Sequence, residues 1–383
     1  MAAEDGAILT PAASTVFEKL CPIHGELASP EDAQRRTGED SRGRDFPGRD
    51  GQAARSARPR SRPADTTNIC AASFPSDDAA QAEYWNRAGA RRWIDNQHIL
   101  HQLLRPVSAR LMAAARAEAG ERVIDVGCGC DATTIDFAGR VAPHGEVLGL
   151  DISAPMLERA REGAPADLPL RFVLGDAATL ELAPGWADLV VSRFGVMFFA
   201  DPVRALANLR RGMRPGGRLA FACWHAAERN PWMIAPLREA SKHAPPLPEA
   251  GPEDPGPFSF ADEKRVRRVF REAGYDDIAL DPHEFEFDIA LGRGLDTAVA
   301  TALASGPTSR VLDGQSEAVH AAAAADIRAA LAPHARGASV PLGAAIWIVT
   351  AANPRLSPNK WRPTFSSTES VMSASPPRRP ASG

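Results

Sequence analysis

The feature that most constrains the fold is a series of short apolar segments separated by segments with helical periodicity. Nearly continuous Val, Ile and Leu character is typical of parallel strands that are buried on both faces. Alternation of such strands with helices predicts an α/β fold with a doubly wound, Rossmann-like sheet. The expected strands are RVIDVG (122–127), EVLGLD (146–151), LRFVLGD (170–176), ADLVVSRF (187–194) and RLAFACW (218–224).

The segment DPVRALANLRRGMRPGG (201–217) shows how a connecting helix is encoded. Asp201 is expected to cap the helix, and Pro202 suits its first turn. Gly216 and Gly217 then release the chain into the next strand. The order of these signals predicts a helix that packs its apolar stripe on the sheet.

Further elements are expected on both sides of this core. Residues 79–117 have the pattern of N-terminal helices, and DEKRVRRVFREAGY (262–275) that of another helix. IALDPHEFEFDIA (278–290) and VPLGAAIWIVTAA (340–352) are expected to be strands. The Ala-rich residues 292–335 between them are predicted to be helical. We expect this insertion to form a lid over the ligand edge of the sheet.

The composition of the two ends differs from that of the middle. Residues 1–78 are rich in Arg, Gly, Ser and Pro, and residues 355–383 in Ser and Pro, so both are expected to be disordered. Residues 79–354 are expected to form one domain. Its expected parts are N-terminal helices (79–117), a cofactor-binding core (118–224) and a substrate and lid region with the last strands (225–354).

Charge, hydropathy and cysteine spacing exclude several classes of function. The formal net charge is −4, which gives no general affinity for nucleic acid or acidic membranes. No apolar run approaches the ~18 residues that span a bilayer, and the start MAAEDG is unlike a secretory signal, so a cytoplasmic location is expected. Cys128 and Cys130 lack the further ligands that structural zinc needs, and no metal site is expected.

The stretch VIDVGCGCDATT (123–134) has the pattern of a buried strand, a glycine-rich turn and a helix. Glycine at this junction lets the backbone approach a nucleotide-like cofactor closely. Gly127, Gly129 and Ala132 fit the dinucleotide fingerprint, with Asp151 the acid about 20 residues further on. An NAD-linked oxidoreductase is therefore one candidate.

Three acids favour a different cofactor. Asp125 precedes the first glycine and can hold a cationic amino group, and Asp176 is placed to meet an adenine amino group. Asp131 stands at the mouth of the turn, where a carboxylate would repel the pyrophosphate of a dinucleotide. S-adenosylmethionine carries no phosphate but has a sulfonium and an ammonium, so it tolerates nearby acids. We expect Asp131 to cap the following helix with its side chain, facing away from the ligand.

Residues 79–354 resemble the bacterial class I S-adenosylmethionine-dependent methyltransferases, in the small-molecule group related to ubiquinone/menaquinone C-methyltransferases. The resemblance rests on YWN, VIDVGCGC, GLDISAPMLERA, GDA, SRFGVMFFADP, MRPGGRLAFACW and NPWM. It implies a seven-stranded sheet that is mostly parallel, with an antiparallel last strand at 339–351. It also implies S-adenosylmethionine as cofactor and methyl transfer to a small molecule. Asp131 departs from the family pattern, which usually has glycine there.

The resemblance also implies roles for residues at the strand ends. Asp151 is expected to bind the ribose hydroxyls and Ile152 to pack on the adenine. Arg193 is expected beside the methionine part of the cofactor. The full set of expected cofactor residues is Asp125, Gly127, Cys128, Gly129, Asp151, Ile152, Asp176, Ala177 and Arg193.

The acceptor side is less constrained by the sequence. A carbon or oxygen acceptor can require a general base, for which the candidates are His225, His98 and His101. Aromatic residues are candidates for the walls of an acceptor pocket or for core packing. They are Tyr84, Trp85, Phe194, Trp224 and Trp232. The strand-four motif of amino-methyltransferases that act on DNA is missing from SRFGVMFF, so a nucleic-acid acceptor is not expected. A non-catalytic protein that only binds the cofactor is a further alternative.

Overall fold

The computed structural model describes residues 74–75, 77–247, 251 and 253–355. The tail expected at 355–383, except residue 355, and nearly all of the extension expected at 1–78 lie outside these residues. Phe74 is 8% exposed, and its ring packs on those of Tyr84 and Phe198. Packing therefore begins before the expected domain start at residue 79.

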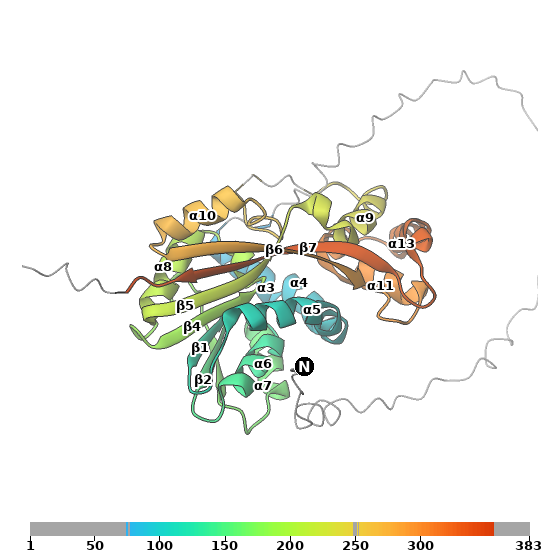
Figure 1. Ribbon diagram of the computed structural model, residues 1–383. Coiled ribbons are helices and arrows are strands. Elements are labelled where there is room, and N and C mark those ends of the chain that lie inside the picture. The colour runs from blue at the N-terminus through green and yellow to red at the C-terminus, as the bar shows by residue number, and fades with distance from the viewer. Residues whose placement is uncertain (1–73, 76, 248–250, 252, 356–383) are drawn as a thin grey trace, which may run out of the picture. The chain divides into compact units, whose positions relative to one another are not determined.

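A seven-stranded sheet with the order β3-β2-β1-β4-β5-β7-β6 forms the centre of the described structure (Figure 1). The strands from β1 to β5 pair in parallel, and β7 lies antiparallel between β5 and β6. The predicted doubly wound sheet and its antiparallel last strand are confirmed. The strand bounds are β1 Arg122–Val126, β2 Glu146–Asp151, β3 Leu170–Leu174, β4 Ala187–Arg193, β5 Met213–Trp224, β6 Asp276–Asp288 and β7 Pro341–Ala352.

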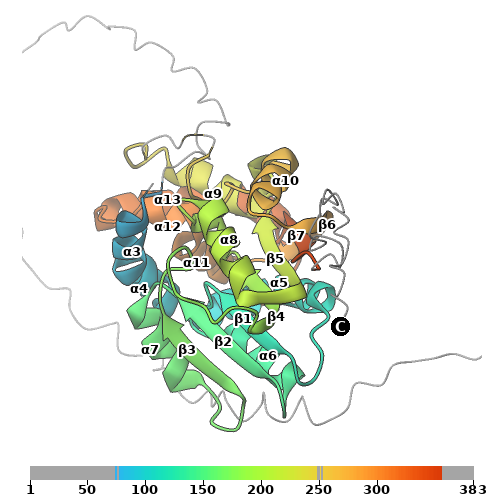
Figure 2. The same cartoon turned by 90° about the vertical axis from the view of Figure 1, so that its left-hand side faces the viewer.

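Helices cover both faces of the sheet, as Figures 1 and 2 show. One face carries α5 (Gln97–Ala115), α6 (Ala132–Val141) and α7 (Ala154–Gly163), and the other carries α8 (Pro202–Gly212) and α10 (Glu263–Glu272). This arrangement explains the apolar strand sequences, because Val123, Ile124 and Val126 of β1 are at most 2% exposed. In α8, the Asp201 side chain accepts a hydrogen bond from the Arg204 amide at 2.9 Å, as predicted for its cap.

The remaining helices lie at the end of the sheet where the parallel strands finish. Helices α9 (Pro231–Ala240), α11 (Leu295–Ala304), α12 (Gly306–Val311) and α13 (Glu317–Leu331) pack on one another (Figure 1). Helices α3 (Asp78–Asn86) and α4 (Ala88–Asp95) precede α5 and contact α7. Among the described helices, none is both long and apolar enough to cross a membrane.

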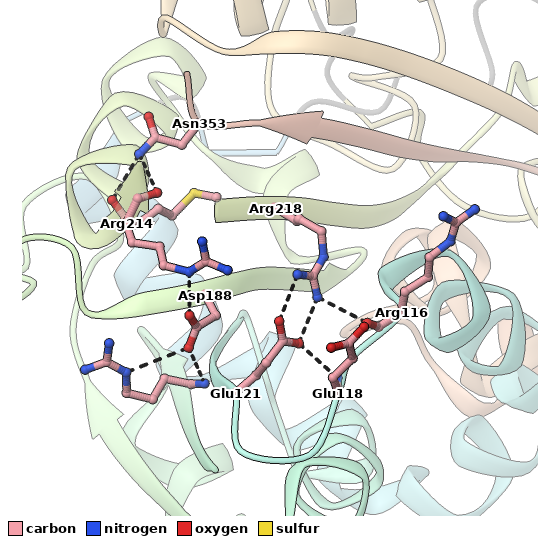
Figure 3. Close-up of polar contacts among 9 residues, drawn as sticks. Arg116, Glu118, Glu121, Asp188, Arg214, Arg218 and Asn353 are labelled. Atoms are coloured by element: carbon pink, nitrogen blue, oxygen red, sulfur yellow. Dashed lines mark hydrogen bonds and ion pairs between the residues drawn. The ribbon is translucent and has the colours of Figure 1, made fainter. Parts of the chain in front are cut away.

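A polar network joins the chain segments at the opposite end of the sheet (Figure 3). Arg218 of β5 donates two hydrogen bonds of 2.8 Å to the carboxylate of Glu121, which precedes β1. Asp188 of β4 accepts from the amide of Arg122 and from Arg214. These contacts align the first residues of three parallel strands, so the carboxyl ends of the strands, where polar side chains gather, are held at a common edge.

Candidate functional site

The turn that follows β1 has a backbone that requires glycine. Gly127 and Gly129 have φ angles of 66° and 58°, in the left-handed region. A Cβ atom on Gly127 would lie 2.7 Å from Cα of Gly195, in the turn after β4. On Gly129 it would lie 3.0 Å from the Met156 side chain. The turns after β1 and β4 therefore pack backbone against backbone, and a side chain on Gly127 would force them apart.

A cavity of about 130 Å³ lies at this edge of the sheet. Its floor comes from the turn after β1 and from the ends of β2 and β4, and α3 and α4 contribute a further wall. Of the residues expected at the site, the cavity is lined by Trp85, Gly127, Cys128, Gly129, Asp151, Ile152, Asp176, Ala177, Arg193 and Phe194.

Asp151, the last residue of β2, is held by two backbone donors. Its Oδ2 accepts from the Gly129 amide at 2.8 Å, and its Oδ1 accepts from the Ser153 amide at 2.9 Å. Burial raises the pKa of its carboxyl, although these hydrogen bonds oppose the shift. A carboxylate oxygen can accept more than one hydrogen bond, so both oxygens can still take a ligand hydroxyl.

Asp125 does not line the cavity, because Thr133 lies between its carboxylate and the cavity. Its Oδ2 accepts from the hydroxyls of Thr133 and Thr134 at 2.7 and 2.8 Å, and Thr133 does line the cavity. The Oδ1 atom is buried without a hydrogen-bond partner. Burial raises the pKa of this carboxyl to about 6. The Asp125 carboxylate lies behind Thr133, so it does not contact a ligand in the cavity directly. Its charge nevertheless makes the electrostatic potential of the cavity more negative.

The prediction that the Asp131 side chain caps α6 is wrong. It occupies the N-cap position of α6, but its side chain makes no capping hydrogen bond, and its φ of 85° lies in the left-handed region. The carboxylate turns toward Gly163 at the end of α7 and does not line the cavity. The expected orientation away from the ligand is therefore present, whereas the expected hydrogen bond is not.

Arg193 is the cation of the cavity wall. Its Nη1 donates to Ser108 Oγ of α5 at 2.8 Å. It interacts electrostatically with Asp125, Asp136 and Asp131, which favour its charged form. Burial lowers the pKa of this guanidinium. Its remaining N–H groups are available to an anionic group in the cavity.

The three histidine candidates are not brought to the cavity. His98 is exposed on α5, and His225 stacks on Trp347 with ring centroids 4.4 Å apart. His101 has a buried Nε2 without a partner, and burial together with Arg193 lowers its pKa to about 4. None of the three lines the described cavity.

The aromatic candidates fall into two clusters on either side of the cavity. Trp85 lines the cavity and packs edge-on against Tyr84 and Phe198. Phe194 also lines it and stacks on Trp224 at 4.1 Å. Trp224 in turn contacts Trp232, so Tyr84, Trp224 and Trp232 support the cavity walls from behind.

Several lining residues escaped the sequence analysis. Asp78, Gln81 and Trp93 come from α3 and α4, and Phe198 and Asp201 follow β4. The YWN segment lies in α3 and was the one feature of the sequence that indicated a role for this helix. Hydrophobic periodicity does not show which helix covers a cavity. Helices α11–α13, expected as a lid, contribute no residue to the lining of this described cavity.

The buried thiols of the turn are poor metal ligands. Burial raises the pKa of Cys128 well above its usual range and that of Cys130 to about 12. Metal binding requires the thiolate. In the part of the chain that the structure describes, no group of three or more Cys, His, Asp or Glu side chains is placed to hold a metal ion.

Comparison with known proteins agrees with this geometry. Residues 124–221, which contain the turn and the strands β2–β4, match the methyltransferase domain family. Nocamycin O-methyltransferase of Saccharothrix syringae is 33% identical over 153 residues, 39% of this chain and 54% of that protein. Demethylmenaquinone methyltransferase of Thermus thermophilus is 39% identical over 111 residues, 29% of this chain and 50% of that protein.

A third relative is the malonyl-[acyl-carrier protein] O-methyltransferase of Pectobacterium atrosepticum. It is 39% identical over 122 residues, 32% of this chain and 46% of that protein. The match thus spans about half the length of each of these relatives. Residues 124–221 are therefore similar to methyltransferase domains, and they contribute strands to the seven-stranded sheet described above.

Proposed function

We propose that the protein transfers the methyl group of S-adenosylmethionine to a small-molecule acceptor. The observation that carries the proposal is the charge of the cavity. Its described lining includes four carboxylates and one guanidinium, that of Arg193. The carboxylates belong to Asp78, Asp151, Asp176 and Asp201. Such a cavity favours a ligand with positive charge, and S-adenosylmethionine carries both a sulfonium and an ammonium.

The same charges oppose the alternative of an NAD-linked oxidoreductase. A dinucleotide places its pyrophosphate at the N-terminus of the helix after the glycine turn. Here Asp131 occupies the N-cap of α6, and the buried Asp125 lies behind Thr133 of the same helix. The carboxylate of Asp125 would repel a pyrophosphate at this place, whereas that of Asp131 turns toward Gly163.

The residues of the cavity fit the parts of S-adenosylmethionine. The Gly127–Gly129 turn admits close backbone approach, and Asp151 offers acceptors for the two ribose hydroxyls. Arg193 can donate to the carboxylate of the amino-acid end, and the field of Asp125 favours the ammonium. Asp176 also lines the cavity, and its oxygens, which accept from Ala178 and Thr179 of its own turn, can each accept a further hydrogen bond, as those of Asp151 can.

When bound, S-adenosylmethionine supplies a methyl group on a positively charged sulfur. The acceptor attacks the methyl carbon in line with the carbon–sulfur bond, and the sulfur leaves as a neutral thioether. The contribution of this chain is to orient the reactants and to exclude water. Trp85, Phe194 and Phe198 provide apolar walls for both tasks. Because His98, His101 and His225 lie away from the cavity, we propose that no histidine of this set acts as the base.

Ligand binding tests the cofactor. S-adenosylhomocysteine should raise the melting temperature of the protein, and NADH should leave it unchanged. Asp151→Ala should weaken S-adenosylhomocysteine binding by about 1.5–3 kcal/mol, the range for hydrogen bonds to a charged group. Asp167→Ala, at an exposed loop position, is the matched control and should bind normally. Stabilisation by NADH alone would refute the proposal.

Transfer itself separates an enzyme from a protein that only binds the cofactor. S-adenosylmethionine labelled on its methyl group, incubated with the protein and a pool of small metabolites, should give labelled product. Asp151→Ala should reduce the rate at low cofactor concentration. Binding without transfer to any compound of the pool would favour the non-catalytic alternative.

We also propose a cytoplasmic location. In support, Cys128, Cys130 and Cys223 are free thiols in the described chain, as is usual in reducing compartments. Fractionation of the cells that make the protein tests this part.

A further inference from the structure

Asn86, the last residue of α3, belongs to the YWN segment and has no role in the site described above. Its side-chain amide joins α3 to the loop after β2. Nδ2 donates to the carbonyl of Ile152 at 2.9 Å, and Oδ1 accepts from the amide of Ala154 at 2.9 Å. Nδ2 also donates to the carbonyl of Ala82 one turn back in α3, which fixes the orientation of the amide group.

The loop that Asn86 holds carries the principal acid of the cavity. Asp151 precedes Ile152 directly, and its Oδ1 accepts from the amide of Ser153. Asn86 therefore contacts the peptide groups on both sides of Ser153, while Asp151 contacts the amide of Ser153 itself. The direction of the Asp151 carboxylate and the position of Asn86 depend on the same short stretch of backbone.

The helix on the other side of this contact forms part of the cavity wall. We call α3 and α4, residues 78–95, the roof, because Asp78, Gln81, Trp85 and Trp93 of these helices line the cavity. Gln81 holds the Trp85 ring, since its Oε1 accepts from Trp85 Nε1 at 3.1 Å. A displacement of α3 would therefore move the Trp85 ring with it.

Apolar packing against Met156 of α7 and contacts further from Asp151 also hold the roof. The Trp85 ring packs on Phe198 at 5.0 Å, next to the turn after β4. Arg92 forms an ion pair with Asp313 at 2.8 Å, on the side of α12. Among the described residues, the two hydrogen bonds between α3 and residues 152–154 both come from Asn86. Asn86 alone thus couples the roof to the acid-bearing loop through side-chain hydrogen bonds.

We propose that Asn86 is a positioning residue that fixes the roof and the Asp151 loop as one unit around the nucleoside part of the ligand. The inference rests on the proposed function, because it takes S-adenosylmethionine as that ligand. Asn86 is exposed, so its hydrogen bonds compete with water and contribute little to global stability. Its effect is therefore expected on ligand binding and not on folding.

The test measures binding of two ligands to the full-length protein by calorimetry. Asn86→Ala should raise the Kd of S-adenosylhomocysteine about five- to tenfold and speed its dissociation. The Kd of 5′-methylthioadenosine, which lacks the amino-acid part, should rise by the same factor, because the contact lies at the nucleoside end. Asn86→Asp should also bind more weakly than the unchanged protein, because it keeps the acceptor for Ala154 but cannot donate to Ile152.

A matched control comes from the residue that directly follows the roof. Asn96 follows α4 and donates only to the carbonyl of Arg92 at 2.8 Å, so Asn96→Ala removes an amide without touching the Asp151 loop. Its Kd should stay within twofold of the unchanged protein. The melting temperature without ligand should be nearly the same for all these variants.

A double-mutant cycle separates positioning from a general structural role. If Asn86 acts through the loop of Asp151, Asn86→Ala should weaken binding less than twofold once Asp151 is already Ala. Additive losses, an unchanged Kd in Asn86→Ala, or failure of both Asn86 variants to fold would overturn the inference. Failure of the proposed function would instead appear as no S-adenosylhomocysteine binding by the unchanged protein.

Discussion

Asp131 combines a left-handed backbone with a buried carboxyl. Its φ is 85° and its side chain belongs to a residue that is 5% exposed. Burial raises the pKa of this carboxyl to about 7, although Arg159 and Arg193 oppose the shift. Glycine at this position would avoid both the backbone strain and the buried charge.

Asp131→Gly is therefore expected to stabilise the protein. Relief of the left-handed strain offers about 1–2 kcal/mol, and the greater freedom of glycine in the unfolded chain offsets about 0.5–1 kcal/mol of it. The free energy of unfolding at pH 8 should rise further because the buried carboxylate is gone. Cofactor affinity should stay within a few-fold, because the side chain faces Gly163. Denaturant unfolding and calorimetry measure the two quantities.

Asp131→Asn separates charge from backbone strain in this experiment. The folded-state pKa is raised above the usual 3.8, so the unchanged protein loses stability as the pH rises from about 4 to about 7. Asn keeps the backbone conformation and should remove this slope. A loss of cofactor affinity beyond tenfold in Asp131→Gly would mean that the carboxylate serves the ligand after all.

The sequence predicted which residues lie at the cavity where their placement follows from local order along the chain. Gly127, Gly129 and Asp151 directly follow or end apolar strands, and parallel strands bring such positions to one edge. The missing cap of Asp131 could not be predicted, because it depends on a backbone angle. The position of Asp125 behind Thr133 depends on packing between β1 and α6, which no spacing encodes.

At the scale of elements, the strands and helices with a clear hydrophobic periodicity were predictable from the sequence. How these elements pack on one another was predictable only in part. The stripe of α8 and the alternation of β1 to β5 led directly to the sheet. The helix that covers the cavity was not predictable, because α3 and α11 have similar lengths and both lie outside the alternating core. The structure lines the cavity with α3 and α4.

The pair of Glu121 and Arg218 links two of these elements at the far end of the sheet (Figure 3). Burial alone would raise the pKa of Glu121, but hydrogen bonds from Arg218 and from the amide of Glu118 outweigh it and lower the pKa. The stabilisation is therefore present above about pH 4.5, the usual pKa of the group, and lost as the pH falls. Glu121→Gln should lower the free energy of unfolding at pH 7 by about 1–2 kcal/mol, with a smaller difference at pH 4.

An exposed ion pair provides the comparison for this change. Glu162 pairs with Arg159 on α7, and its side chain is 68% exposed. Glu162→Gln should change stability by less than about 0.5 kcal/mol. Both variants are measured by urea denaturation at both pH values. Equal losses in the free energy of unfolding would show that the bidentate contact between Glu121 and Arg218 stabilises the fold no more than an exposed ion pair does.

At the scale of the whole molecule, the start of the domain was the boundary that the sequence placed too late. Phe74 lies before the first segment with helical periodicity. The composition around it therefore resembles that of the residues that precede it. In the structure its ring lies 4.9 Å from that of Phe198, and the Arg310 guanidinium stands 3.8 Å above it. Long-range contacts of a single aromatic residue leave no local signal in a sequence.

Two shortened chains test the consequence of this boundary. A chain of residues 74–355 should bind S-adenosylhomocysteine like the full chain, because it keeps every described residue of the roof. A chain of residues 79–355 lacks Phe74, the cavity-lining Asp78 and also Asp77, whose side chain caps α3 by accepting from the Ala80 amide at 2.8 Å. It also lacks the carbonyl of Pro75, to which Gln81 donates at 2.6 Å.

Loss of the cap costs about 1 kcal/mol, and loss of the Gln81 partner loosens the residue that holds Trp85 over the cavity. The Kd of the 79–355 chain should therefore rise about tenfold or more, since each 1.4 kcal/mol is a tenfold change. Its far-UV circular dichroism should still show the folded sheet, because none of the missing residues belongs to a strand. Equal affinity of the two chains would show that the residues before 79 do not support the roof.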